Sequence, residues 1–369
     1  GIIVMKLRSL LISALMNVCA LCPAWASAHI IDDHQASSSA STSYFLKTLP
    51  NDILAHILTY VSGPSLHRLW ETGNKTTQQH LTKNVQAFDI SQSYPPNITP
   101  LPENLLKVIA SRFSLLRELD VYWNKFVGNV LTHEIPLFPR LSIWNLKNCG
   151  LTTLSENLFQ LPNLTSLNIS LNGLGDSNSL DKIISLTNLK TLIAQHCGLT
   201  RWPQQFLQLP SLTDLDISHN HVSEGASSEV TISLKQLIRL NLEECGLTTL
   251  PKSLSQLPSL THLNLLYNKF PNDRLPDEVL SLIQLRELKI GGHHLPPLPE
   301  RITHLLSLTH LTIRSYEFEI ISLLPLLRLN QLQMIDMPGD PHLKSTLPVE
   351  LQPYVHIFKD FDWSGIRSY

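Results

Sequence analysis

Residues 237–270 read LIRLNLEECGLTTLPKSLSQLPSLTHLNLLYNKF, and this stretch contains one pattern twice. Leucines stand at the first, fourth and sixth positions of an eleven-residue motif that starts at Leu237 and again at Leu260. The ninth position holds Cys245 in the first copy and Asn268 in the second. Self-similarity at a period of about 20 to 50 residues is the signature of a repeat architecture, in which each unit buries its apolar side against its neighbours. The repeat therefore decides the fold.

The motif recurs along most of the chain. Its pattern, L-x-x-L-x-L-x-x-N/C-x-L, starts at residues 116, 141, 164, 189, 212, 237, 260, 285 and 308, and a degraded copy starts at residue 332. The spacing alternates between 25 and 23 residues, with a last step of 24. These are leucine-rich repeats, and they predict an α/β solenoid with a curved parallel β-sheet inside and short helices or 3₁₀ turns outside. A proline often precedes the short apolar run between motifs, as expected at the start of such a helix.

In the first seven motifs the ninth position alternates between asparagine and cysteine, so the duplicated unit was a pair of repeats. An asparagine there satisfies backbone amides and carbonyls of the turn, and a cysteine is small enough to fill the same place as a weak donor. Cysteines 48 residues apart would lie two strands apart, about 9 to 10 Å, beyond disulfide reach. We therefore assign a structural ladder, with no catalytic or metal role, to Asn124, Cys149, Asn172, Cys197, Asn220, Cys245 and Asn268.

A leader and a linker are predicted ahead of the repeats. From Met5, a basic start, the apolar run LLISALMNVCALC and the small residues of PAWASA match a secretory signal peptide. No later segment offers about 18 uninterrupted apolar residues, so we expect a secreted protein with no membrane contact after leader cleavage. The predicted boundaries are a signal peptide at 1–28, a flexible linker at 29–44, a small helical domain at 45–85, a connecting and capping segment at 86–115, repeats at 116–343 and a C-terminal cap at 344–369.

The helical domain begins FLKTLPNDILAHILTYVSGPSLHRLW, with apolar residues at helical spacing after a Pro-Asn-Asp start. Over residues 45–81, about a tenth of the chain, it resembles the F-box. The matching residues are Leu49, Pro50, Asp52, Ile53, Leu54, Ile57, Leu58, Tyr60, Val61, Ser65, Leu66 and Leu69. One departure is that no tryptophan follows Lys75, where the family usually has one.

The resemblance implies that these helices dock on a Skp-type adaptor of a cullin ubiquitin ligase while the repeats hold the protein to be ubiquitinated. The adaptor-binding residues would be Leu49, Pro50, Ile53, Leu54, Ile57, Leu58, Leu66 and Leu69. Three short helices cannot bury all of these apolar side chains by themselves, so a partner groove is plausible physically. The alternative is that the helices cap the N-terminal end of the solenoid.

The exposed inner face of a solenoid is its default binding surface, built here from motif positions 3, 5, 7 and 8. Aromatic side chains beside mixed charges suit a protein partner. The predicted target-binding residues are Tyr122, Trp123, His196, His219, Glu243, Tyr267 and Arg314. The same positions also hold Asp120, Asp214, Asp216, Glu244, His262, Lys289 and His310.

Catalytic signatures are missing from the sequence. It contains no P-loop, no G-x-S-x-G and no H-E-x-x-H. With a formal charge of -2 and scattered Lys and Arg, it lacks the basic stripe of a nucleic-acid binder. We expect no enzyme activity, no cofactor, no metal and no nucleic acid as a partner.

The leader and the F-box resemblance point to different compartments, because an F-box acts in eukaryotic cytosol. A bacterium that lives in host cells and exports the protein resolves this, and the domain order resembles eukaryote-like effectors of such bacteria. The sequence thus predicts a secreted, non-catalytic receptor that recruits an unknown target to a host ubiquitin ligase. The alternatives are a secreted or surface repeat protein with no ubiquitin role, and a eukaryotic secretory-pathway protein.

Overall fold

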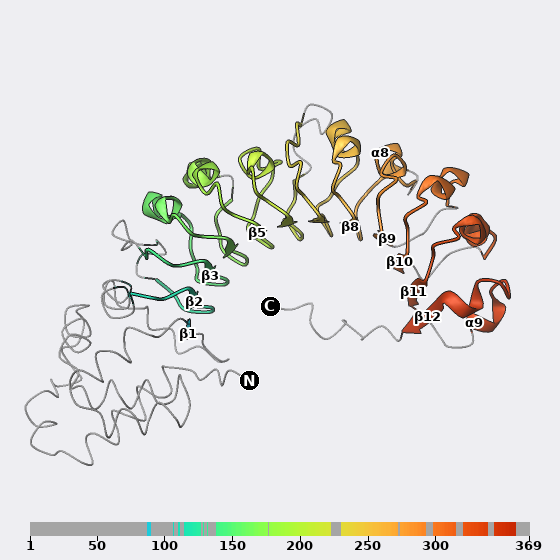
Figure 1. Cartoon of the computed structure of the whole chain (residues 1–369), viewed down its shortest axis with the longest axis horizontal. Helices are drawn as coiled ribbons and strands as arrows, with labels where there is room; N and C mark the ends of the chain where they lie inside the picture. Colours follow the sequence, from blue (N-terminus) through green and yellow to red (C-terminus); the bar gives the residue numbers. More distant parts are fainter. Residues whose placement is uncertain are drawn as a thin grey trace, which may run out of the picture. The chain divides into compact units, whose positions relative to one another are not determined.

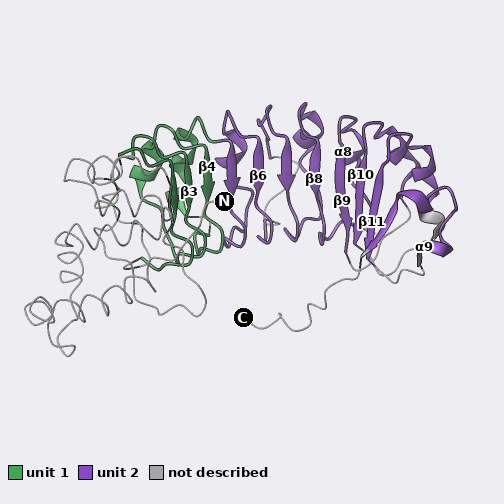
Figure 2. Ribbon diagram, turned by 60° about the horizontal axis from the view of Figure 1, so that its bottom comes forward, with its two compact units in different colours: residues 1–189 green, residues 190–369 purple. Residues whose placement is uncertain are grey.

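The described part of the chain covers most of the predicted repeats. The computed structural model describes residues 87–89, 106, 110, 114–126, 128, 131, 138–175, 177–222, 230–271, 274–292, 298–314, 320–338 and 343–358. The chain divides into two compact units, residues 1–189 and residues 190–369 (Figure 2). The predicted leader, linker and F-box-like domain, with all eight predicted adaptor-binding residues, lie outside the described residues.

The first unit contains a parallel sheet whose strands follow one another in chain order. The strands are β1 (Ala87–Asp89), β2 (Glu118–Asp120), β3 (Ile143–Asn145) and β4 (Ser166–Asn168). Two 3₁₀ helices, η2 (Glu156–Gln160) and η3 (Asn178–Ser185), lie on the side away from the strands (Figure 1). Each begins after a serine whose hydroxyl accepts a hydrogen bond from the first turn, Ser155 for η2 and Ser177 for η3.

The second unit repeats this arrangement with parallel strands in chain order. They are β5 (Thr191–Ile193), β6 (Asp214–Asp216), β7 (Arg239–Asn241), β8 (His262–Asn264), β9 (Glu287–Gly291), β10 (His310–Arg314), β11 (Met334–Pro338) and β12 (Val355–Phe358). The intervening helical segments are η4 (Phe206–Gln208), η6 (Lys252–Gln256), α8 (Asp277–Leu280), η8 (Glu300–His304), η9 (Ile320–Arg328), α9 (Leu343–Thr346) and η10 (Gln352–Tyr354). The predicted parallel sheet with short helices and 3₁₀ turns is confirmed.

The strand register explains why leucine recurs at the fourth motif position. Equivalent positions face one another across the sheet, so Leu240 pairs with Leu263, which pairs with Leu288. All three side chains are buried. Each repeat thus stacks its leucines on those of its neighbour, and the apolar area removed from water stabilises the stack at about 25 cal/mol per Å².

Trp144 takes this leucine position in β3. Its side chain is fully buried and meets Phe138 edge-on, with ring centroids 6.1 Å apart and an interplanar angle of 67°. Among the described residues, the indole N–H has no hydrogen-bond partner. The larger ring therefore gains apolar burial at the expense of one unsatisfied donor.

The sheets extend by one strand beyond each end of the predicted motif series. The ten motifs supply β2 to β11. β1 falls in the predicted connecting segment, and Phe88 and Ile90, together with Val85 at the end of the predicted helical domain, have the spacing of motif positions 1, 4 and 6. β12 falls in the predicted C-terminal cap and pairs with β11 through Ile335 and Val355. Part of the predicted cap is thus a strand of the sheet.

Aspartate or asparagine at the fifth motif position ends several strands. Asp216 Oδ1 accepts a hydrogen bond from the Ser218 backbone N–H at 2.9 Å, and Asn241 Oδ1 accepts one from the Glu243 N–H at 3.1 Å. Such a bond to the backbone two residues on turns the chain away from the strand. Lys289 takes this position in β9, which runs on to Gly291.

Candidate binding surface

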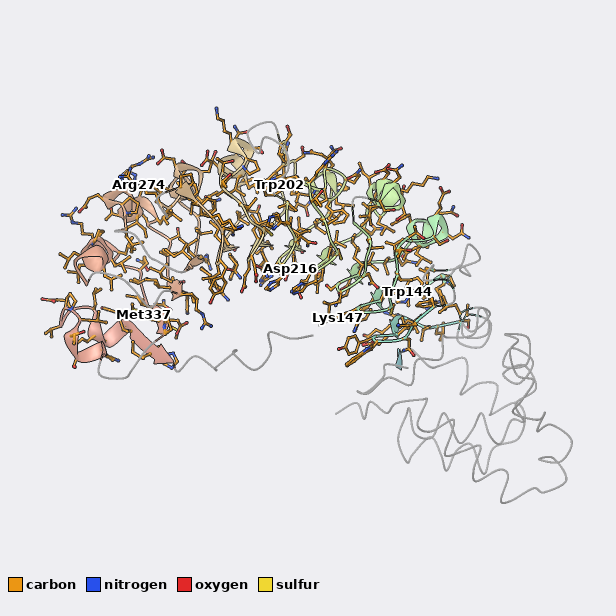
Figure 3. The ribbon with its side chains drawn as sticks, turned by 180° about the vertical axis from the view of Figure 1, so that it is seen from behind. Trp144, Lys147, Trp202, Asp216, Arg274 and Met337 are labelled. Atoms are coloured by element: carbon orange, nitrogen blue, oxygen red, sulfur yellow. The ribbon has the colours of Figure 1, made fainter. Side chains whose placement is uncertain are left out.

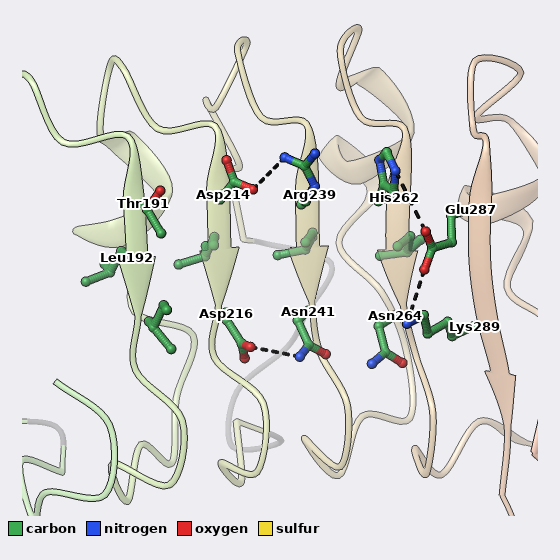
Figure 4. A pocket seen from close by; sticks show the side chains of 14 residues that line it. Thr191, Leu192, Asp214, Asp216, Arg239, Asn241, His262, Asn264, Glu287 and Lys289 are labelled. Atoms are coloured by element: carbon green, nitrogen blue, oxygen red, sulfur yellow. Dashed lines mark hydrogen bonds and ion pairs between the residues drawn. The ribbon is translucent and has the colours of Figure 1, made fainter. Parts of the chain in front are cut away.

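The exposed face of the sheet in the second unit is hollowed over β5 to β9, and we call this region the polar hollow. Its volume is about 380 Å³. Figure 4 shows the side chains of the third and of the fifth motif positions along it, with leucines of the fourth position between them. Within this unit Asp216 lies on the strand side, whereas Trp202 lies toward the helical side (Figure 3). The alternation of a strand places these polar side chains outward and the leucines inward.

Ion pairs fix the row of third-position side chains. The Arg239 guanidinium lies 2.8 Å from the Asp214 carboxylate. Glu287 lies 3.1 Å from Lys289 on its own strand and 3.8 Å from the His262 ring. These side chains are 28% to 57% exposed, so each pair contributes at most about 1 kcal/mol to stability. Their main effect is to hold the side chains in defined orientations.

Carboxamides join the fifth-position row to its neighbours. Asp216 Oδ2 accepts hydrogen bonds from Gln195 at 2.7 Å and from Asn241 at 2.9 Å. The Asn264 amide donates to the Glu243 carboxylate at 2.9 Å. Every bond crosses from one strand or turn to the next, so the polar hollow is pre-organised across β5 to β8.

The imidazole of His262 is held between a hydroxyl and a carboxylate. Its Nδ1 lies 2.8 Å from the Thr261 hydroxyl, and its Nε2 faces Glu287. Burial lowers the pKa of His262 below its ordinary value and outweighs the opposing effect of Glu287. The ring is therefore a neutral hydrogen-bonding group near pH 7. The same Thr-His pair recurs at Thr309 and His310, at 2.9 Å.

The ninth-position asparagines bridge consecutive repeats. Asn172 Oδ1 accepts hydrogen bonds from the backbone N–H groups of Cys149 at 3.0 Å and Leu151 at 2.9 Å. Its Nδ2 donates to the carbonyls of Leu146 at 2.9 Å and Ile169 at 2.8 Å. The same set of bonds is made by Asn220 and Asn268. Each asparagine thus ties its repeat to the cysteine repeat before it.

The cysteines of the ladder are buried free thiols. The Cys149 thiol donates to the Val121 carbonyl at 3.3 Å, and the Cys245 thiol donates to the Ile217 carbonyl at 3.3 Å. Burial raises the pKa of each of these two thiols to about 12. Both remain protonated at neutral pH, so neither is a nucleophile.

Residues 210–270 match the family described as leucine rich repeat. Each unit is a leucine-rich-repeat solenoid. A leucine-rich-repeat protein of Leptospira interrogans is similar in structure, with 23% identity, 85% of this chain and 93% of that chain covered, and a TM-score of 0.45. The plant peptide hormone receptor RGFR1 in complex with RGF2 is also similar, with 16% identity, 75% of this chain covered and a TM-score of 0.44; the match spans 51% of the receptor chain. No curated protein matches the chain.

Six of the seven predicted target-binding residues lie in the turns after the strands, and none of the seven lines the polar hollow. In the first unit, the Tyr122 and Trp123 rings are 5.8 Å apart. In the second, the His196 and His219 rings stack with centroids 4.4 Å apart, and His219 lies 2.9 Å from a carboxylate of the next repeat. Tyr267 is 40% exposed. Glu243 follows β7, whereas Arg314 is the last residue of β10.

The polar hollow also contains leucine-rich-repeat residues that the sequence analysis did not name. They include Arg239, Asn241, Asn264 and Glu287. All four occupy the third or fifth motif position, so their placement on the exposed face was readable from the repeat. Which of them join into one hollow depends on the bonds between neighbouring strands, and the repeat pattern contains no signal for those bonds.

Two other kinds of site have no candidate within the described ranges. No group of three or more His, Cys, Asp or Glu side chains is placed there to hold a metal ion. No helix in those ranges has the length and apolar character needed to cross a membrane.

Proposed function

We propose that this chain is a non-catalytic protein-interaction protein whose leucine-rich repeats bind a partner protein on the strand face of the second unit. The observation that carries the proposal is the polar hollow, where Asp214, Arg239, Asp216 and Asn241 are held in place by bonds between strands. Side chains that are already ordered lose little rotational freedom on binding, which favours affinity. Enzyme chemistry has no comparable support, since the thiols of Cys149 and Cys245 are protonated and buried.

Site-specific photo-crosslinking tests this proposal. A photoreactive benzoylphenylalanine replaces His262 in the polar hollow, and in a control variant it replaces Gln256, an exposed residue of η6. We expect covalent adducts with one or a few partner proteins from the His262 position and none from Gln256. Equal adduct patterns from the two positions would show that the strand face has no binding role.

The proposal extends to the N-terminal domain, which would act as an F-box that docks on a Skp-type adaptor of a cullin ubiquitin ligase. Support comes from the sequence of residues 45–81 and from the order of helical module, spacer and repeats. The repeats would then recruit a target protein for ubiquitination. Together with the leader at 1–28, this describes a secreted bacterial effector that acts in the host cytosol.

Co-purification tests the adaptor role. Residues 29–369 are expressed with a recombinant Skp-type adaptor, beside a Leu49→Ala/Pro50→Ala control. We expect a stoichiometric complex that is lost in the control. A folded protein that forms no complex would instead favour the second candidate, a secreted or surface leucine-rich-repeat binding protein with no ubiquitin role, which the leader sequence supports equally well.

A further inference from the structure

The strand face of the second unit has an uneven distribution of charge. At motif positions 3, 5, 7 and 8, the repeats of β6 and β7 hold four carboxylates and one guanidinium, a net charge of -3 with histidine neutral. The repeats of β8 and β9 hold one carboxylate and one ammonium at these positions, a net charge of 0. The acidic excess is therefore confined to one part of the face.

Three of these carboxylates have no Lys or Arg partner among the described residues. Asp216 receives hydrogen bonds only from neutral donors, including Gln195 and Asn241. Glu243 receives one from Asn264, and Glu244 lies 2.9 Å from the His219 ring. Asp214, by contrast, is paired with Arg239. Most of the acidic charge over β6 and β7 is therefore not balanced by a cation of the described part of the chain.

The three carboxylates also act on one neighbouring group. Burial is the main reason that the pKa of Cys245 is raised, and Asp216, Glu243 and Glu244 each raise it further. The three side chains therefore share one negative field at the end of β6 and β7. A cation that binds nearby would meet this combined field rather than a single charge.

The length of the polar hollow favours an extended segment. It runs across five strands, and four spacings of about 4.8 Å give about 19 Å. An extended chain covers this distance with about six residues. Asn241 and Asn264 each use one amide hydrogen in the bonds described above, so each retains a second N–H for the backbone of such a segment.

We infer that the strand face of the second unit docks an extended segment of a partner protein that carries arginine or lysine, with the cationic side chains over Asp216, Glu243 and Glu244. The inference rests on the proposed binding function and specifies the chemistry of the partner. Complementary charge raises the rate of encounter and rejects acidic segments, because like charges placed together are costly.

Fluorescence anisotropy with the full chain and three labelled peptides tests this inference. The probes are GSRSRSG, GSQSQSG and GSESESG, each blocked at both ends. At low salt we expect the arginine peptide to bind at least about tenfold more tightly than the glutamine peptide, and the glutamate peptide not to bind. Added salt should weaken the binding. Absence of binding by the arginine peptide, or equal binding of all three, would overturn the inference.

Matched variants separate local recognition from net charge. Glu243→Gln/Glu244→Gln removes two carboxylates from the strand face, whereas Asp277→Asn/Glu300→Gln removes two from the helical side, where they pair with Arg301 and Arg328. We expect the preference for the arginine peptide to fall to within about threefold in the first variant only. An equal loss in both variants would mean that only the overall charge matters, which also overturns the inference.

Reversing the charge of the two glutamates should create a new binding preference rather than remove one. Glu243→Lys/Glu244→Lys should bind the glutamate peptide in preference to the arginine peptide, and an unchanged preference would count against the inference. If these peptide experiments fail while His262 still forms crosslinks to a protein partner, the proposed function stands and only the partner chemistry is wrong. If the crosslinks also fail, the binding function itself is wrong.

Discussion

Replacing Asn220 by alanine should cost far more stability than its size suggests. Its Oδ1 accepts hydrogen bonds from the backbone N–H groups of Cys197 at 2.9 Å and Leu199 at 3.1 Å. Its Nδ2 donates to the carbonyls of Ala194 and Ile217, both at 2.8 Å. The residue is 4% exposed, so water does not readily replace it. Two buried amides left unpaired cost about 1 to 3 kcal/mol each, and we expect a total loss of about 4 kcal/mol.

Asn268 is the matched comparison within the same unit. It makes equivalent hydrogen bonds to Cys245, Leu247, Leu242 and Leu265, but it is only partly buried. Water can therefore replace part of what the side chain provides, and we expect Asn268→Ala to cost about 1 to 2 kcal/mol. The difference between the two variants isolates the effect of burial on the same hydrogen bonds.

A third variant, Asn220→Cys, tests whether the two ladder residues are interchangeable. The chain itself uses cysteine at this motif position, yet a thiol cannot accept hydrogen bonds from both Cys197 and Leu199. We expect the loss to approach that of Asn220→Ala. Urea unfolding followed by far-ultraviolet circular dichroism measures all three free energies of unfolding. A loss below about 1 kcal/mol for Asn220→Ala, or equal losses for Asn220→Ala and Asn268→Ala, would refute the reasoning.

Three further outcomes are expected. Gly291 has φ +123°, and a Cβ there would lie 2.2 Å from the Arg314 carbonyl oxygen, so Gly291→Ala should lower the thermal midpoint by more than a surface substitution does; an unchanged midpoint would contradict the close approach. The pKa of Cys149 and Cys245 is raised to about 12, so the folded state retains protons that the unfolded state releases, and stability should fall between about pH 9 and pH 12 by about 1.4 kcal/mol per pH unit and thiol. In a Cys149→Ala/Cys245→Ala variant, the free energy of unfolding measured with urea should fall less steeply with rising pH. A fall as steep as that of the unsubstituted protein would contradict the prediction. Because the pKa of His262 is lowered, the unfolded state binds its proton first, and stability should fall as pH drops below about 6.5; NMR titration should place the His262 pKa below that value, and a higher pKa would show that burial does not dominate.

The repeat pattern predicted the strands well because one rule applies to every copy. A leucine that must stack on the next leucine fixes both the strand and its register, as Leu240, Leu263 and Leu288 show. The pattern also located the exposed positions, since side chains alternate along a strand. β1 was missed because its motif is separated from the next by a longer segment and has Phe88 where the other copies have leucine, isoleucine or tryptophan.

The binding surface was less predictable because it depends on partners in neighbouring strands. The repeat pattern places Asp216 on the exposed inner face, but its carboxylate also binds the Ser218 backbone N–H and two carboxamides. Arg239 belongs to the binding surface because its guanidinium pairs with Asp214 on the neighbouring strand, and the sequence pattern does not indicate this pairing. Such bonds depend on side-chain rotamers across the sheet, and a motif that is mostly apolar spacing contains no information about them.

The alternation of asparagine and cysteine in the ladder determines which insertions and deletions of repeats the fold can tolerate. Removing residues 212–259, a pair of repeats, would leave the Cys197 repeat beside the Asn268 repeat, with an acceptor still supplied to its backbone amides. Removing residues 212–236 alone would bring Cys197 beside Cys245, and the amides that Asn220 now serves would face a thiol. We therefore expect the alternating repeats to tolerate insertions and deletions of 48 residues, the length of one pair of repeats, better than those of a single repeat.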